Sequence, residues 1–381
     1  MLTSRERILR TVAGRDVDQT PLCFFLFSGL RRLCADGLEY ARRQLELGVD
    51  VCLELGGPSL GRHREVQVET TLLPGEPNPF LRQVWRTPAG DLETVVERSP
   101  DWPHGDRVPI MTDFVIPRAR KFLVQEEKDL GPLRYLLPDP TADEAAEFLS
   151  AAEPLRAFAR EQGLATRAGF NRLSDTVCWL CGCEAFATMG RANPALFGGI
   201  LEVVDDWQRK LLDVTLQARP DIVVDAQWYA TTFLSPEIYR RFLLPLLKRR
   251  AELVHEAGAK FCAIATTNVL PFAECLKDIG VDLLFGVDPI MGSWDLPRAK
   301  RELGGAMCLA GGVNGYLSIV DGTPEKVRQA VRHAMEVLAP GGRFILAPVD
   351  DVRTEPDSPE GAWDRAWANV LVMVEEWKRL R

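Results

Sequence analysis

The chain has 381 residues and a formal net charge of −8 at pH 7. An acidic chain without a basic stripe is not expected to bind nucleic acid, because recognition of phosphates requires clustered Lys and Arg. Apolar residues make up 46% of the chain and charged residues 26%, the composition of an ordinary globular protein. No run approaches the ~20 apolar residues that span a bilayer, so we expect no membrane segment.

The N-terminus and the cysteines indicate the compartment. Residues 1–9 are charged, and Thr3 and Glu6 have the spacing of a helical capping box, which is not the pattern of a secretory signal. The nine cysteines are odd in number and lack disulfide-like regularity, so we expect reduced thiols. These features predict a cytoplasmic protein.

Strand and helix patterns alternate along most of the chain. The apolar run 21–27 and residues 50–54 predict two strands, and 31–47 predicts a helix between them. Eight βα units in sequence favour a (β/α)8 TIM barrel over a doubly wound sheet, and no glycine fingerprint for a dinucleotide is present. The six later strands, each followed by a helical segment, are predicted at 164–171, 221–228, 260–266, 281–287, 306–312 and 343–348.

Residues 62–118 interrupt the alternation. Short alternating segments flank the turn Thr87-Pro-Ala-Gly90 and predict an antiparallel β-hairpin or small sheet inserted after the second strand. We therefore expect one barrel domain over 1–381, with 62–118 as an inserted lid region. The insertion contains His63 and His104, which are candidates to reach over the barrel mouth. Residues 119–137 and 141–162 predict two helices after it.

Polar residues gather where the predicted strands end. In barrels of this type the chemistry lies at the carboxyl ends of the strands, and there the sequence predicts an acidic, amide-rich mouth. Its residues are Glu54, Asn171, Arg172, Asp225, Gln227, Thr266, Thr267, Asn268, Asp288, Asn314, Asp350 and Asp351.

Several of these residues have two interpretations. Asp225 and Gln227 are either an acid/base group with an orienting amide or members of a buried structural network. Asp350 has the same two interpretations. Residues 266–268 either line the pocket or satisfy their own turn. The segment Cys178-Trp-Leu-Cys-Gly-Cys183 suggests metal ligation or, given its apolar neighbours and missing fourth ligand, buried structural thiols.

Five motifs resemble one superfamily. They are Thr3-Ser-Arg-Glu-Arg-Ile-Leu9, Asp18-Gln-Thr-Pro-Leu22, Ser235-Pro-Glu-Ile-Tyr239, Gly322-Thr-Pro-Glu-Lys-Val327 and Gly341-Gly-Arg-Phe-Ile345. Together they resemble the uroporphyrinogen decarboxylase superfamily, and Thr87-Pro-Ala-Gly90 is similar to the hairpin of its methyltransferase-like members. The resemblance extends over nearly the whole chain. It implies a barrel that hosts either decarboxylation of tetrapyrrole acetate groups or methyl transfer with a corrinoid and a zinc-bound thiol.

This sequence departs from the residues that characterise the methyltransferases and the decarboxylases of the superfamily. The zinc methyltransferases carry a His-x-Cys pair and a later cysteine, and the resemblance places Ile264, Thr266 and Asp350 at these positions. Isoleucine cannot ligate zinc and threonine is a poor ligand, so no zinc is expected at the family site. The decarboxylases carry an Arg-Gln-Ala-Gly-Arg segment after the first strand, and Arg31 and Arg32 lie near that place without its spacing.

The function predicted from the sequence is methyl transfer or demethylation of a small methylated metabolite, with a partner-bound corrinoid (cobalamin) as acceptor. Asp225 and Asp350 are the predicted catalytic residues. The alternatives are a decarboxylase or lyase of a small aromatic or pyrrolic acid, and a non-catalytic ligand-binding paralogue. We expect a small-molecule substrate, a corrinoid protein as candidate partner and a homodimer as candidate assembly. The predicted substrate-binding residues are Glu54, Asn171, Gln227, Thr266, Asn268 and Asp288.

Overall fold

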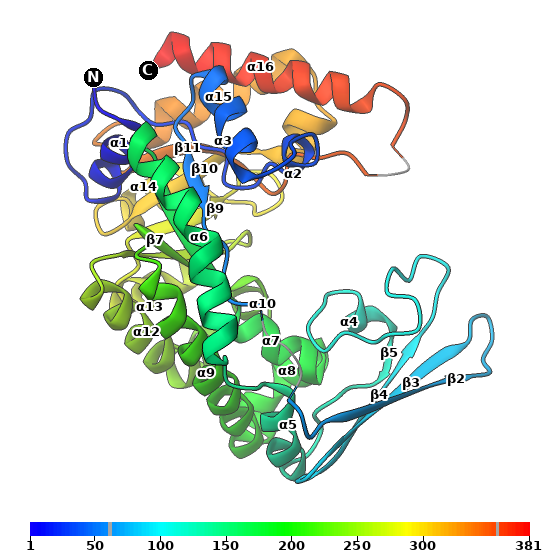
Figure 1. Cartoon of the computed structure of the whole chain (residues 1–381). Coiled ribbons are helices and arrows are strands. Elements are labelled where there is room, and N and C mark those ends of the chain that lie inside the picture. Colours follow the sequence, from blue (N-terminus) through cyan, green and yellow to red (C-terminus); the bar gives the residue numbers. More distant parts are fainter. Residues whose placement is uncertain (60–62, 356–357) are drawn as a thin grey trace.

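The computed structural model describes residues 1–59, 63–355 and 358–381, without the side chains of residues 170 and 171. Its main feature is a curled sheet of seven strands in the order β1-β6-β7-β8-β9-β10-β11, with every neighbouring pair parallel (Figure 1). The protein therefore has a mixed α/β fold built on a parallel sheet. The strands are β1 (Cys52–Glu54), β6 (Ala165–Asn171), β7 (Ile222–Ala226), β8 (Lys260–Ile264), β9 (Leu283–Val287), β10 (Cys308–Asn314) and β11 (Phe344–Val349).

The extended segment at residues 21–24 lies between the two ends of this sheet. Leu22 forms a parallel bridge to Leu346 of β11, and Cys23 forms one to Asp50, just before β1. The backbone N–H of Cys23 donates to the Leu346 carbonyl at 3.0 Å, and that of Asp50 donates to the Leu22 carbonyl at 2.8 Å. The segment that the sequence predicts as the first strand thus contacts both edge strands through single bridges.

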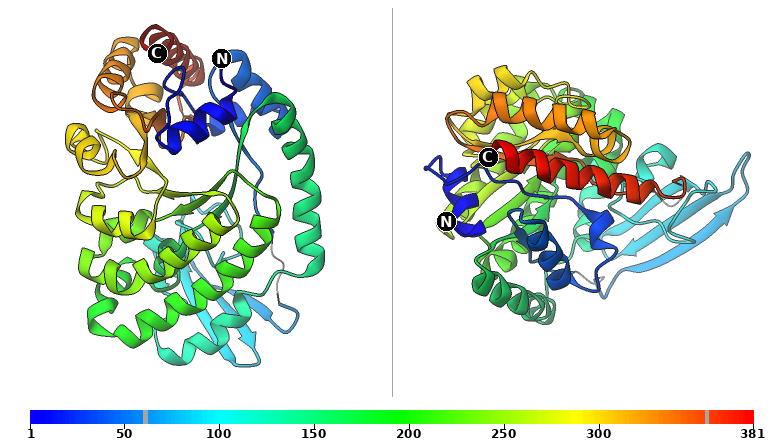
Figure 2. Two further views of the ribbon diagram at one scale, coloured as in Figure 1. Left: turned by 90° about the vertical axis from the view of Figure 1, so that its left-hand side faces the viewer. Right: turned by 90° about the horizontal axis from the view of Figure 1, so that it is seen from above.

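Helices surround the curled sheet, as the left view of Figure 2 shows. Within the described ranges, none of them combines the length and apolar character needed to cross a membrane. The α-helices are α1 (Ser4–Val12), α2 (Ser28–Arg31), α3 (Gly37–Leu47), α4 (Val115–Arg118), α5 (Leu130–Leu136), α6 (Ala142–Gln162), α7 (Leu173–Cys181), α8 (Cys183–Ala192), α9 (Pro194–Gln217), α10 (Trp228–Phe233), α11 (Pro236–Ile238), α12 (Leu244–Glu256), α13 (Ala273–Ile279), α14 (Leu296–Leu303), α15 (Pro324–Leu338) and α16 (Ala362–Leu380). Shorter turns are η1 (Glu127–Asp129), η2 (Tyr239–Leu243), η3 (Leu270–Phe272) and η4 (Gly315–Val320).

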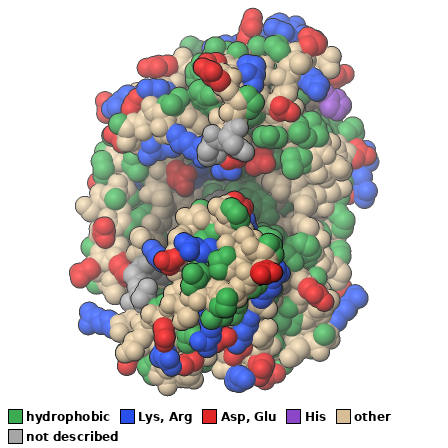
Figure 3. Space-filling model, turned by 90° about the vertical axis from the view of Figure 1, so that its right-hand side faces the viewer, with side chains coloured by type: hydrophobic (Ala, Val, Ile, Leu, Met, Phe, Trp, Pro, Cys, Tyr) green, Lys and Arg blue, Asp and Glu red, His purple; other side chains and the backbone are tan. Residues whose placement is uncertain are grey.

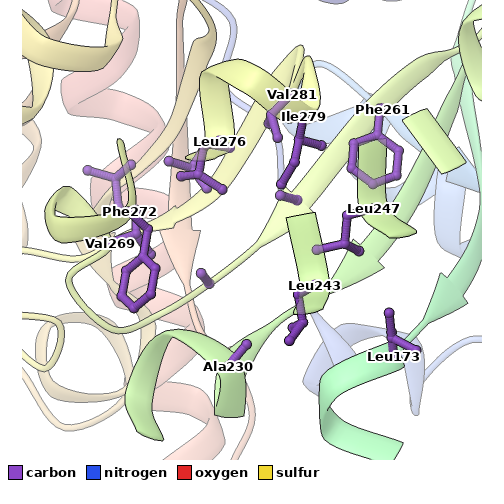
Figure 4. Packing of buried hydrophobic residues seen from close by; sticks show 14 of the residues in the cluster. Leu173, Ala230, Leu243, Leu247, Phe261, Val269, Phe272, Leu276, Ile279 and Val281 are labelled. Carbon is purple, nitrogen blue, oxygen red and sulfur yellow. The ribbon is translucent and has the colours of Figure 1, made fainter. Parts of the chain in front are cut away.

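The two faces of the sheet bury two separate apolar layers. Alternate residues of β7, such as Ile222 and Val224, belong to a cluster inside the curl, which Ile8 and Val12 of α1 join. The opposite residues pack against the helices. Figure 4 shows part of that outer layer, in which Phe261 of β8 belongs to one buried cluster with residues of α12 and α13 such as Leu247, Leu276 and Ile279. The sheet is therefore apolar on both faces, as expected for parallel strands covered by helices.

A second, four-stranded antiparallel sheet extends away from the first (Figure 1). Its strands are β2 (Gln67–Leu73), β3 (Phe80–Thr87), β4 (Gly90–Glu97) and β5 (Ala119–Lys121). We call residues 67–121 the arm. The turn between β3 and β4 pairs Thr87 with Gly90, whose φ of +126° is accessible only to glycine. The predicted insertion at 62–118 thus contains β2, β3 and β4, and β5 follows directly after it.

Three predicted elements differ from the structure. The strand predicted at 221–228 ends at Ala226, because Gln227 caps α10 and Trp228 begins it, so the strand assignment of these two residues is wrong. The helix predicted at 119–137 is in fact β5 followed by η1 and α5. Within the described part of the chain, the segment predicted as a strand at 21–27 forms only the two single bridges described above. The other predicted strands are present with bounds shifted by a few residues.

Candidate active site at the carboxyl ends of the parallel strands

The space between the curled sheet and the arm is the candidate site. Arm residues bond to side chains that follow β6 and β7: Asp113 Oδ1 accepts from Trp179 Nε1 at 2.7 Å and from the Tyr229 hydroxyl at 3.3 Å. The arm therefore lies over the carboxyl ends of these strands. Figure 3 shows that the molecule is hollowed on this side, where barrel enzymes perform their chemistry.

Asp225, a predicted catalytic residue, lies in a buried network behind this mouth. Its Oδ2 accepts from Arg250 Nη1 at 3.1 Å, and neither side chain is more than 1% exposed. Arg250 also donates from Nε to Asp205 at 2.7 Å, and Gln227 donates to Asp225 at 3.4 Å. Burial raises the pKa of Asp225 to about 6 against the opposing effect of Arg250. The structure thus places Asp225 and Gln227 in the structural network that was the alternative interpretation.

Other predicted mouth residues hold loops together. Asp288 accepts from the Ile290 backbone at 2.8 Å and from Asn314 Nδ2 at 2.7 Å, so it joins the loops after β9 and β10. Asn268 accepts from the Leu270 backbone at 3.1 Å, which is a local turn. Thr266 is partly exposed at the end of β8. The side chain of Asn171 lies outside the described residues.

Asp350 and Asp351 follow β11 in different environments. Asp350 is exposed, has a φ of +71°, and accepts from the Asp351 backbone at 2.8 Å. Asp351 accepts from both the backbone and the hydroxyl of Ser28, so it anchors the start of α2. The structure therefore separates the two predicted catalytic carboxyls: Asp350 faces solvent and Asp225 is enclosed.

A polar and aromatic group, of which the sequence analysis found only Arg172, lies where β6 and β7 lead into α7 and α10. The Arg172 guanidinium lies over two indole rings, 5.3 Å from the Trp179 centroid and 5.1 Å from that of Trp228. Beside it is Asp175, in the first turn of α7. The available sequence signal was the run Arg172-Leu-Ser-Asp175 at a predicted strand end, of which only Arg172 was noted.

The pKa of Asp175 is raised by its environment. Its Oδ1 accepts from the Tyr229 backbone at 3.0 Å and from Ser174 Oγ at 3.1 Å, whereas its Oδ2 is buried without a hydrogen-bond partner among the described residues. Burial raises the pKa of Asp175 to about 7, although Arg172 opposes the shift. The carboxyl is thus divided between its protonated and ionised forms at neutral pH.

A cavity of about 420 Å³ opens beside β1. Arg167 of β6 and Glu54 of β1 line it, and Arg167 Nη2 donates to Glu54 Oε2 at 2.8 Å and to the Phe25 carbonyl at 2.6 Å. The predicted binding residue Glu54 thus lines a cavity. Arg167 was not predicted, because only its strand was recognised.

At the three positions where the superfamily's methyltransferases bind zinc, this chain does not carry a set of zinc-binding side chains. Ile264 is buried inside the curl at 1% exposure, and Thr266 and Asp350 occupy the other two positions. In residues 1–59, 63–355 and 358–381, no three His, Cys, Asp or Glu side chains are arranged to hold a metal ion. We therefore derive no reaction step through zinc at this place.

The cysteine segment and the two histidines have other partners. Cys178 and Cys181 are buried free thiols, and Cys178 Sγ lies 3.6 Å from Cys183 Sγ. His104 packs against Trp102 and Phe114 within the arm. His63 packs edge-on against Tyr135 of α5, with ring centroids 5.1 Å apart.

The fold and this site define a class of protein: an α/β fold with its candidate site at the carboxyl ends of parallel strands. Residues 175–357 match the family model "Uroporphyrinogen decarboxylase (URO-D)". The predicted resemblance to the uroporphyrinogen decarboxylase superfamily is thereby confirmed over residues 175–357.

The chain is similar to two solved structures to different degrees. A methyltransferase from Methanosarcina mazei is 17% identical, with a TM-score of 0.62, and the alignment covers 100% of this chain and 99% of that one. A B12-independent methionine synthase from Shewanella sp. W3-18-1 is 9% identical with a TM-score of 0.46, covering 95% of this chain and 98% of that one. No curated protein shows significant similarity to the chain.

Removing the cation of the buried network should destabilise the fold. Arg250→Met leaves Asp225 buried without its counterion, so the free energy of unfolding should fall by about 3–5 kcal/mol in urea denaturation. The control is Arg249→Met, because Arg249 also pairs with Asp205 but its side chain is 49% exposed; its loss should be about 1 kcal/mol or less. Equal losses in the two variants would contradict the network's role.

The raised pKa of Asp175 should appear in the pH dependence of stability. The folded state holds this proton up to about pH 7, whereas the unfolded chain releases it near pH ~4. Asp175 therefore makes the free energy of unfolding fall as pH rises through this range. Denaturation at pH 5 and pH 8 should show a smaller decline for Asp175→Asn than for the wild type. An unchanged decline would show that the carboxyl is not shifted.

Proposed function

We propose that the chain is a methyl-transfer enzyme of its superfamily that demethylates a small methylated substrate at this mouth. In this proposal a corrinoid held by a partner protein accepts the methyl group, and zinc at the family position takes no part. The observation that carries the proposal is Asp175, a proton donor with a pKa near neutrality beside the Arg172 and tryptophan group.

The shared fold supports this choice between the superfamily's reactions. The Methanosarcina mazei methyltransferase aligns over the whole length of the chain. We also propose that residues 21–24 complete the curled sheet as an eighth strand, giving a (β/α)8 barrel into which the arm is inserted; the bridges to Leu346 and Asp50 support this.

The surface around the mouth supports access for a large acceptor. Large exposed apolar side chains recur in the arm and in the segments that follow β7, β9 and β10, and such groups mark interaction surfaces when they gather. These residues are Phe114, Phe233, Ile290, Met291, Tyr316 and Leu317. A partner that presents a corrinoid would meet them as it approaches the mouth.

The chemistry assigned to this chain is proton delivery. Removing a methyl group from oxygen or nitrogen breaks the carbon–heteroatom bond, and the departing heteroatom keeps the electron pair. A corrinoid supplies the nucleophile that takes the methyl group. Asp175 would donate its proton to the departing heteroatom as general acid, while Trp179 and Trp228 provide apolar walls. Local opening of α7 or α10 would bring the buried Oδ2 to the substrate.

A second candidate function is a lyase or decarboxylase acting on a small aromatic or pyrrolic acid. The observation that favours it is Arg167 in the cavity beside β1, because a guanidinium is a fitting partner for a substrate carboxylate. In that reaction the carbon–carboxylate bond breaks, carbon dioxide leaves, and a carboxyl such as Asp175 protonates the carbanion. The two functions differ in whether cob(I)alamin is consumed or carbon dioxide is released.

The general-acid role predicts a pH profile. Methyl transfer to cob(I)alamin should decline as pH rises above about 7, because the protonated form of Asp175 is lost. Asp175→Asn should lower kcat by about 10²-fold or more and remove this part of the profile. Asp206→Asn changes a partly exposed carboxylate on the outer helix α9 and serves as the control. A mutant that retains kcat and the same profile would remove Asp175 from the mechanism.

The proposal that zinc takes no part in the reaction predicts how much zinc the purified protein contains. Protein purified without added metal should contain far less than one zinc per chain, because Ile264 cannot replace an imidazole ligand. Elemental analysis before and after dialysis against a chelator measures this. About one retained zinc per chain would mean a relocated metal site and would overturn the zinc-free mechanism.

A further inference from the structure

We propose that the cavity beside β1 is a carboxylate subsite, and that the substrate is therefore a small aromatic acid that carries its methyl group on a heteroatom. Arg167 would be the residue that determines this specificity. The inference rests on the proposed function only for the methyl group, since binding of the acid is a property of the cavity itself.

The cavity has the size and lining of a small-molecule site. Its volume of about 420 Å³ falls in the range that holds small ligands. Phe25, Tyr40, Leu53 and Leu155 contribute apolar and aromatic walls, and Arg167 contributes a cation. The lining also includes Arg31, but that residue is exposed whereas Arg167 is buried. A flat acid could therefore place its ring against the apolar walls and its carboxylate on the Arg167 guanidinium.

Arg167 is a buried cation with donors that its protein partners leave unused. The residue is 9% exposed, and its hydrogen bonds run from Nη2 to Glu54 and to the Phe25 carbonyl. A guanidinium carries five N–H donors and stays charged at all relevant pH values. An anion that enters the cavity would therefore meet a cation that can donate further hydrogen bonds.

Glu54 is a counterion that can be displaced. It accepts from Arg167 Nη2 at 2.8 Å, yet its side chain is 57% exposed, whereas that of Arg167 is 11% exposed. The glutamate can therefore turn into water at little cost while the arginine cannot move. An incoming carboxylate would take the place of the Glu54 carboxylate on Nη2. Asp351 does not compete for Arg167, because Ser28 already donates two hydrogen bonds to it.

The pair Arg167–Glu54 and the pair Arg172–Asp175 would then have separate roles in binding and in catalysis. Arg167 would hold the acid end of the substrate from β6. Arg172 and Asp175 lie a few residues further along the same chain segment, where β6 leads into α7. One strand and its following helix turn would thus supply both the anchor for the acid and the proton for the departing heteroatom.

The test compares an acid with its uncharged amide. Isothermal titration of the full chain without corrinoid would use 4-methoxybenzoate and 4-methoxybenzamide as probes. We expect the acid to bind about tenfold or more tightly than the amide. Arg167→Met should abolish this preference, whereas Glu54→Gln should strengthen binding of the acid several-fold because it removes the competing carboxylate.

The controls separate a lost subsite from a lost fold. Arg160→Gln removes a 60% exposed arginine outside this cavity and should leave both affinities unchanged. Arg167→Lys keeps a cation at the site and should keep part of the preference, and circular dichroism checks that each variant is folded. Equal affinity for acid and amide, or no binding of either, would overturn the subsite.

Failure of the proposed function would look different. If the acid binds as expected but no methyl group reaches cob(I)alamin, the carboxylate subsite stands and methyl transfer is wrong. Retention of the acid preference in a folded Arg167→Met variant would instead overturn the role of Arg167, whatever the turnover.

Discussion

The ion pair between Arg250 and the carboxylates of Asp205 and Asp225 is the constraint on which the arrangement of the site depends. It fixes α12 against α9 and β7 with three side chains that are at most 2% exposed. An unpaired charge in such a place would cost several kcal/mol, so the three elements must keep their relative positions. Because Asp225 points outward to this pair, the inner face of β7 is left to Ile222, Val224 and Ala226. The mouth is consequently built from the residues that follow the strands.

The sequence predicts the alternation of strands and helices well, and the reason is physical. Parallel strands buried on both faces are short apolar runs, and the helices between them begin with capping residues such as Thr323 before α15. Because both faces of such a strand are buried and apolar, the sequence does not show which face points into the curl of the sheet. Alternation along a strand puts Asp225 on the opposite face from Ile222 and Val224, as the structure shows. It does not tell which face meets the helices, since apolar residues lie on both faces: Val223 on one, Ile222 and Val224 on the other.

The candidate site was only partly predictable for a related reason. Glu54 and Arg172 were found because they follow predicted strands, where barrel chemistry is expected. Arg167 lies in the middle of β6 and Asp175 in the first turn of α7, so no rule about strand ends selects them. Their importance comes from burial: desolvation raises the pKa of Asp175, and enclosure leaves Arg167 with a counterion that remains in water. Such environments arise from the packing of distant segments, which spacing along the chain does not reveal.

Two buried arginines show how the same chemistry can stabilise a fold or prepare a site. Arg250 meets two carboxylates that are themselves buried, so all of its partners belong to the protein and none can leave without a large cost. Arg167 is enclosed almost as fully, yet its carboxylate partner is mostly exposed and lies in a cavity. A cation whose counterion can depart is available to an anionic ligand, whereas one with enclosed counterions is not. The mobility of the partner, more than the burial of the arginine, therefore distinguishes the binding group from the structural one.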